Sequence, residues 1–84
     1  MKNITMYTGP MCNFCDAAKR LFSRNNIKYQ EIDIEASNIT REELSKMTGG
    51  STVPQIIINE KCIGGLDNLL KLEQSGELNT LVKK

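Results

Sequence analysis

The sequence predicts an α/β domain in which a four-stranded mixed sheet is flanked by helices. Three observations support this prediction. The 84 residues suffice for one compact core. Segments with strand-like alternation are interspersed with segments of helical periodicity. Gly and Pro residues separate many of these segments. We therefore expect residues 1–84 to form a single domain with the element order βαβ-α-ββ-α.

The first half of the chain begins with a predicted βαβ unit. Apolar and polar residues alternate in a strand over residues 3–8, which ends at Gly9-Pro10. A helix is predicted from about 13 to 25, because apolar side chains recur there along one helical face. A second strand follows over residues 28–34, and two strands joined by a helix in about 30 residues form a βαβ unit. The apolar helical face consists of Phe14, Ala18, Leu21 and Phe22.

The second half predicts a helix, a hairpin and two further helical segments. Residues 40–43 have the capping-box pattern that begins a helix, and Gly49-Gly50 ends it. Ile56–Ile58 is a run of β-branched residues that is typical of a central strand covered on both faces. A turn leads into a short strand over residues 61–63, and Asp67 is well placed to start the next helix. This order of elements fits a thioredoxin-like fold.

Composition and charge exclude several classes of partner. Eleven Lys and Arg residues against ten Asp and Glu residues give a formal net charge of +1. This balance produces no strong field for nucleic acid or an anionic membrane. Polar residues interrupt the apolar runs near the N-terminus, so neither a signal peptide nor a membrane span is predicted. We expect a cytoplasmic protein that binds neither nucleic acid nor membranes.

Cysteine is the residue type that indicates chemistry. The chain has three cysteines and no histidine. An odd number of cysteines, with two of them three positions apart, does not fit a secreted disulfide framework and indicates redox chemistry or metal binding. The lack of histidine excludes Cys–His nucleophilic pairs, histidine acid–base catalysis and Cys/His zinc sites.

The segment Cys12-Asn13-Phe14-Cys15 lies where the first strand gives way to the first helix. Free N–H groups and the positive end of the helix dipole stabilise an anion at Cys12. Because the thiolate attacks disulfides, this placement produces a nucleophile without a general base. The two-residue spacing lets the better shielded Cys15 reach the sulfur of Cys12 across one turn. We therefore predict that Cys12 attacks and that Cys15 resolves.

Other interpretations of the cysteines remain open. The pair could be half of a zinc site, although only Cys62 is left as a cysteine ligand and a carboxylate or partner chain would be needed. The pair could also be inert and buried. Cys62 lies beside Ile63 in a short strand, where we expect it to act as a small buried hydrophobe. Lys19, a turn beyond Cys15, is expected to be solvated.

Four segments together resemble the glutaredoxin family over essentially the whole chain, and most closely its short bacterial dithiol type. The resemblance implies a thioredoxin-like fold, glutathione as co-substrate and no required metal. The segments are Tyr7-Thr8, Cys12-x-x-Cys15, Thr52-Val53-Pro54-Gln55-Ile56 and Ile63-Gly64-Gly65-x-Asp67.

The resemblance also assigns residues to glutathione binding. It implies that Pro54 is a cis-proline facing Cys12, whereas a trans-proline opening an edge strand would be the default without the family. Thr52 and Val53 would bind glutathione, with the backbone N–H and C=O of Val53 pairing with its cysteine. The helix start at Gly65-Leu66-Asp67 would hold the γ-glutamyl carboxylate on free N–H groups, with Asp67 on the amine. Asp67 could also be the helix N-cap.

Arg41 matches a family position that holds the glycine carboxylate of glutathione, and its alternative is an exposed charge in a first helical turn. The chain departs from the family pattern at Gly9 and Ser51, where relatives often carry Lys and Arg. It also has Asn13 and Phe14 between the cysteines, where Pro and Tyr are commonest. Glutathione recognition with fewer cations is therefore expected.

The function predicted from these residues is reduction of protein–glutathione mixed disulfides and protein disulfides by a monomeric enzyme. Its partners would be glutathione and glutathionylated or disulfide-containing proteins. One alternative is a carrier or store of iron–sulfur clusters, for which Asn13 in place of proline is the relevant feature. The other is a thioredoxin-like electron donor that is recharged by a flavoprotein reductase.

Overall fold

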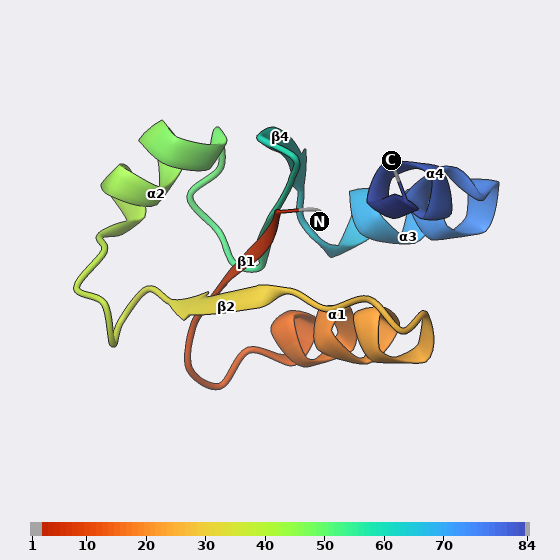
Figure 1. Ribbon diagram of the computed structural model, residues 1–84. Helices are drawn as coiled ribbons and strands as arrows, with labels where there is room; N and C mark the ends of the chain where they lie inside the picture. Colours follow the sequence, from red (N-terminus) through yellow and green to blue (C-terminus); the bar gives the residue numbers. More distant parts are fainter. Residues whose placement is uncertain (1–2, 84) are drawn as a thin grey trace.

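The computed structural model describes residues 3–83 and has the predicted thioredoxin-like architecture. A four-stranded mixed sheet has the strand order β2-β1-β3-β4. Strand β1 pairs in parallel with β2 and antiparallel with β3, and β3 pairs antiparallel with β4. Helices α1, α3 and α4 lie on one side of the sheet, and α2 lies toward the other (Figure 1). The strands are β1 (Ile4–Thr8), β2 (Gln30–Asp33), β3 (Gln55–Ile58) and β4 (Lys61–Gly64).

The helices begin and end close to the predicted positions. The capping box at Thr40 is formed, because its hydroxyl accepts from Glu43 N–H (3.0 Å) and its N–H donates to the Glu43 carboxylate (3.0 Å). Gly49 ends that helix in the left-handed conformation, with φ 86°. The capping box fixes the first turn of α2, where Arg41 lies. The helices are α1 (Asn13–Arg24), α2 (Arg41–Thr48), α3 (Leu66–Ser75) and α4 (Glu77–Lys83).

One main core lies between the sheet and the helices α1, α3 and α4. Alternate residues of β1 and β3 point into it, and α1 contributes Ala18, Leu21 and Phe22 of its predicted face. The prediction was wrong for Phe14, which is exposed. Tyr29, which broke the alternation of the second strand, packs against Phe22 with ring centroids 5.0 Å apart. The buried members of this core are Ile4, Met6, Ala18, Leu21, Phe22, Ile27, Ile56, Ile58, Leu69 and Leu78.

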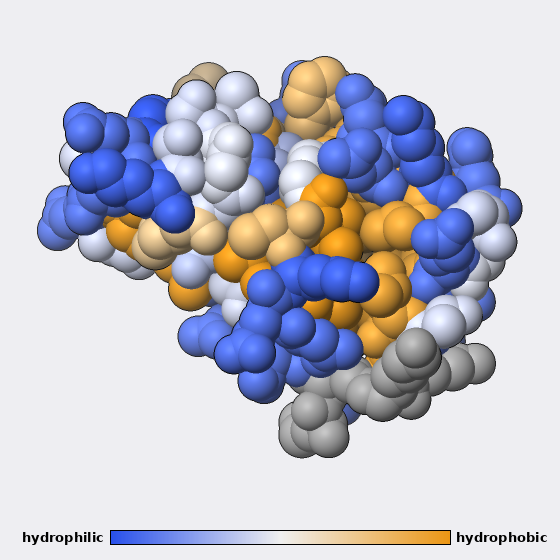
Figure 2. Space-filling model, turned by 90° about the horizontal axis from the view of Figure 1, so that it is seen from above, coloured by the Kyte–Doolittle hydropathy of each residue, from blue (hydrophilic) through white to orange (hydrophobic). Residues whose placement is uncertain are grey.

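The opposite face of the sheet is only partly covered, which the sequence did not predict. Ile56 and Ile58 are buried, but Ile57 between them is half-buried. The short helix α2 packs against β3 on this face and buries Leu44. Hydrophilic residues cover the α2 end of the molecule, and hydrophobic residues reach the surface between β4 and the α3–α4 pair (Figure 2).

Two turns position the strands and helices next to the functional residues. Asn59 and Glu60 both have positive φ (51° and 69°), as a two-residue hairpin turn between β3 and β4 requires. Gly64 ends β4 with φ 106°, a backbone conformation that residues with a side chain rarely adopt. This conformation lets the chain enter α3 directly. Within the described residues, no helix is long and apolar enough to cross a membrane.

Candidate active site

Cys12 is the N-cap residue of α1, at the end of the turn that leaves β1. Its sulfur accepts a hydrogen bond from the backbone N–H of Cys15 at 3.1 Å. On its other side the thiol lies 3.7 Å from the carbonyl oxygen of Val53, to which it donates. Because a cap sulfur faces the free N–H groups of the first helical turn, negative charge on it is stabilised by both the hydrogen bond and the helix dipole. The side chain is half-exposed and can be reached from solvent.

Cys15 lies one turn into α1 and is only 1% exposed. Burial raises the pKa of its thiol from 9.0 to about 12, and the hydrogen bond with Cys12 acts in the same direction. The Gly9 backbone and the charge of Lys19 lower this pKa by smaller amounts, which do not offset burial. Cys15 is therefore held as a neutral thiol beneath the exposed sulfur. The geometry matches the predicted division between an accessible and a shielded thiol.

The loop before β3 brings a proline opposite the cysteines. The peptide bond between Val53 and Pro54 is cis, as the family resemblance implied. Pro54 is buried and Val53 is half-buried, so the loop presents mainly its backbone and the Val53 side chain beside Cys12. The pair Cys12–Val53 spans 41 positions in the sequence, and only the fold brings it together.

The start of α3 leaves its backbone N–H groups free of a side-chain cap. Gly65, and not Asp67, is the N-cap residue, and no side chain bonds to the first turn. The predicted helix start at Gly65-Leu66-Asp67 is confirmed, but the alternative of Asp67 as the N-cap was wrong, because Gly65 takes the extended cap conformation. Asp67 lies in the first turn with its side chain exposed. Free N–H groups at a helix start form a site that favours anions.

Arg41 approaches the same region from α2. It is exposed, and its Nη1 donates to the backbone carbonyl of Ser51 at 3.0 Å. Ser51 is one of the two positions at which the family resemblance led us to expect a cation. The guanidinium of Arg41 therefore lies beside one of the two positions where this chain lacks a cation.

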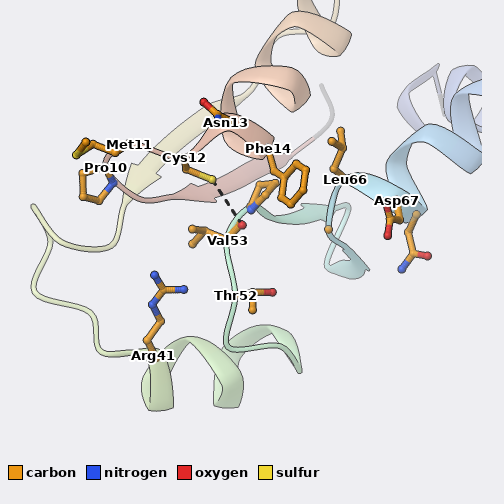
Figure 3. Close-up of a pocket in the computed structure, with 13 residues that line it drawn as sticks. Pro10, Met11, Cys12, Asn13, Phe14, Arg41, Thr52, Val53, Leu66 and Asp67 are labelled. Atoms are coloured by element: carbon orange, nitrogen blue, oxygen red, sulfur yellow. Dashed lines mark hydrogen bonds between the residues drawn. The ribbon is translucent and has the colours of Figure 1, made fainter.

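These parts line one open groove of about 840 Å³ (Figure 3). The groove contains every residue that the sequence assigned to catalysis or glutathione, except for Cys15 beneath it. Sequence reasoning gave no binding role to Pro10, Met11, Asn13, Phe14 and Asn68, which also line it. The apolar residues directly beside Cys12, namely Met11 and Phe14, were the available signal. The predicted residues that line it are Cys12, Arg41, Thr52, Val53, Pro54, Gly65, Leu66 and Asp67.

Two expectations about residues outside the groove were wrong. Cys62 is exposed, not buried, because β4 is the outer strand and Cys62 shares the partly covered face with its partner Ile57. Its thiol lies 3.7 Å from the carbonyl oxygen of Met47. Lys19 is not simply solvated, since its Nζ lies 2.8 Å from the Glu31 carboxylate. Among the described residues, no three Cys, Asp or Glu side chains cluster in a way that could hold a metal ion.

A Cys-x-x-Cys pair at a helix start, with one accessible and one shielded thiol, is typical of disulfide oxidoreductases. The chain is a thiol–disulfide oxidoreductase of the thioredoxin-like fold. Residues 4–63 match the sequence model of the glutaredoxin family. The chain belongs to the glutaredoxin family.

Relatives and solved structures agree with this assignment. Glutaredoxin 3 of Escherichia coli (strain K12) is 41% identical over 83 residues, which cover 99% of this chain and 100% of the relative. A glutaredoxin of Neisseria meningitidis serogroup A is 40% identical over 98% of both chains. A buckwheat glutaredoxin–glutathione complex superposes with a TM-score of 0.86 at 27% identity, covering 96% of this chain and 76% of the other. The solution structure of glutaredoxin from Brucella melitensis superposes with a TM-score of 0.83 at 38% identity, covering 96% of this chain and 88% of the other.

Proposed function

We propose that this oxidoreductase depends on glutathione and reduces protein–glutathione mixed disulfides and protein disulfides. The observation that carries the proposal is a groove with Cys12 between two sites for anions, the guanidinium of Arg41 and the uncapped start of α3. Glutathione carries a carboxylate at each end and a thiol between them, so its chemistry matches this arrangement. The similar buckwheat glutaredoxin was solved as a complex with glutathione, which supports the same ligand here.

Each part of glutathione has a proposed binding residue. The γ-glutamyl carboxylate would accept hydrogen bonds from the free N–H groups at Gly65 and Leu66, and Asp67 would bind the amine. The central cysteine would pair with the backbone of Val53, next to Thr52 and Pro54. The glycine carboxylate would lie at Arg41. The hydrogen bond from Arg41 to the Ser51 carbonyl places its guanidinium next to Ser51, where the family resemblance led us to expect an arginine, and this supports the role.

For a protein–glutathione mixed disulfide, the Cys12 thiolate would attack the glutathione sulfur and the protein thiolate would leave. A second glutathione thiolate would then attack the bound glutathione sulfur, which releases glutathione disulfide and restores the Cys12 thiolate. For a protein disulfide, the client would become joined to Cys12, and the Cys15 thiolate would attack the Cys12 sulfur to expel the client thiolate. Two glutathione molecules would then reduce the Cys12–Cys15 disulfide. This cycle needs no metal, and we propose that a cytoplasmic monomer carries it out.

A glutathione-coupled assay tests the proposal, with a small mixed disulfide and a protein disulfide as substrates. We expect Cys12→Ser to abolish both activities. Cys15→Ser should keep reduction of the mixed disulfide and lose most reduction of the protein disulfide, because only the second reaction requires the resolving thiol. Turnover with a flavoprotein reductase but none with glutathione would contradict glutathione dependence. Equal losses in both variants on the mixed disulfide would contradict the assigned order of the cysteines.

A further inference from the structure

Exposed apolar side chains gather beside the attacking sulfur. Among residues 3–83, the large hydrophobic residues with exposed side chains are Met11 (102%), Phe14 (66%) and Met47 (43%). Met11 directly precedes Cys12 and Phe14 follows it by two positions, whereas Met47 lies on α2. A single exposed hydrophobic residue needs no explanation, but here two of the three are within two positions of the reactive cysteine.

The backbone holds Met11 away from the core. Met11 has φ 52°, a left-handed conformation that is uncommon outside glycine, asparagine and aspartate. Pro10 before it is exposed, and Cys12 after it is already the helix cap. The turn therefore presents a long apolar side chain to solvent at the edge of the groove. Unfavourable backbone conformations of this kind concentrate at functional sites.

Met11 and Phe14 lie on opposite sides of Cys12. Pro10 and Met11 are on one side, and Phe14 lies on the side of Leu66 and the start of α3 (Figure 3). The charged residues that line the groove, Arg41 and Asp67, come from α2 and α3 and not from the Pro10–Met11 turn. The surface around Met11 thus matches an apolar partner and not a charged one.

Thiol–disulfide exchange requires the client sulfur to come within bonding distance of Cys12. The client residues next to that sulfur must therefore cover the neighbours of Cys12, and the apolar surface is continuous with the point of covalent contact. Glutathione, as proposed above, occupies the groove between Arg41 and the start of α3. The Pro10–Met11 turn lines the same groove but lies on the side of Cys12 away from the start of α3, where it can contact the polypeptide part of a glutathionylated client.

We propose that Met11 is a specificity-determining residue, which binds an apolar side chain next to the disulfide-bonded cysteine in an extended segment of the client polypeptide. Phe14 completes this surface on the other side of Cys12. The inference rests on the proposed function, because it names the class of protein substrate that the same site prefers. A small mixed disulfide has no such side chain and gains nothing from Met11.

Single-turnover kinetics test the proposal without relying on recycling by glutathione. The reduced protein is mixed with one of three substrates, each a mixed disulfide between glutathione and another thiol. The three thiols are a peptide with leucines beside its cysteine, the same peptide with serines in those places, and 2-mercaptoethanol. The rate of thiol release is then measured. Met11→Ser should lower the second-order rate constant about tenfold for the leucine peptide, in keeping with partial burial of a methionine side chain. The other two substrates should change less than twofold.

Matched variants separate this effect from structural damage. Met11→Leu should restore most of the rate on the leucine peptide, and Met47→Ser, an exposed methionine on α2, should leave all three rates unchanged. Met11→Gly removes the side chain while accepting the left-handed backbone, so it should behave like Met11→Ser. Equal losses on all three substrates, or no loss on the leucine peptide, would overturn the proposal. Failure of glutathione recycling in steady state would contradict the proposed function instead.

Discussion

Raising the pH should accelerate the release of a protein client from Cys12 through neutral pH and beyond pH 9. Burial is the main reason that the pKa of Cys15 rises from 9.0 to about 12. Below pH 9, the thiolate fraction at Cys15 is therefore much smaller than that of an ordinary thiol. In a mixed disulfide Cys12 no longer shares a thiol hydrogen bond with Cys15, but burial persists. The pH at which resolution reaches half of its maximal rate should then lie between 9.0 and about 12, the range over which burial raises the pKa of Cys15.

The resolution rate should follow the thiolate fraction of Cys15 and rise about tenfold per pH unit from pH 7 to 9. Reduced protein is mixed with excess peptide disulfide in a quenched-flow instrument and stopped in acid at set times. The amount of Cys12–Cys15 disulfide at each time gives the rate at which it appears. Cys15→Ser is the control, since it stops at the mixed disulfide at every pH. A resolution rate that reaches its plateau at or below pH 9 would refute the argument from burial.

Three further results are expected from other parts of the structure. Arg41→Ala should raise the KM for a glutathionylated substrate several-fold, since an exposed charge-assisted hydrogen bond contributes about 1 kcal/mol, whereas Lys46→Ala on the same helix should not. Glu73→Gln should lower the free energy of unfolding by about 0.2–1 kcal/mol in urea denaturation at pH 7, because Glu73 accepts two hydrogen bonds from Arg24 (2.7 and 2.9 Å). The Arg24 hydrogen bonds lower the pKa of Glu73 below 4.5, so this difference should be present above pH 4.5 and disappear as the pH falls through the lowered value. Anaerobic treatment with iron, sulfide and glutathione should leave a colourless monomer, because of the two active-site thiols only Cys12 is accessible to iron, and a coloured dimer would contradict this.

Local signals in the sequence predicted most of the fold. The alternation in residues 3–8, the helical periodicity after Cys12 and the capping box at Thr40 each depend on neighbouring residues only. The structure reproduces all three. The predicted element boundaries are within one residue of the observed ones, except that β2 begins two residues later than predicted. The cis-proline was different, because it entered through the resemblance to a family and not through any local pattern.

The errors arose where exposure depends on distant parts of the chain. Cys62 has the apolar neighbour of a buried strand residue, but its exposure is set by the outer position of β4 and the short length of α2. Lys19 finds its partner Glu31 only because β2 pairs next to β1. Met11 was overlooked because a single methionine after proline has no periodicity, and its exposure follows from a left-handed turn.

The separation between Cys12 and Val53 along the chain has a consequence for newly made protein. A 12-residue helix is marginally stable alone in water, so an unfolded chain does not hold a helix start at Cys12. The opposing loop, 41 positions away, also arrives only when the sheet has formed. The surroundings of Cys12 therefore appear only together with the tertiary structure. The appearance of enzyme activity therefore reports completed folding.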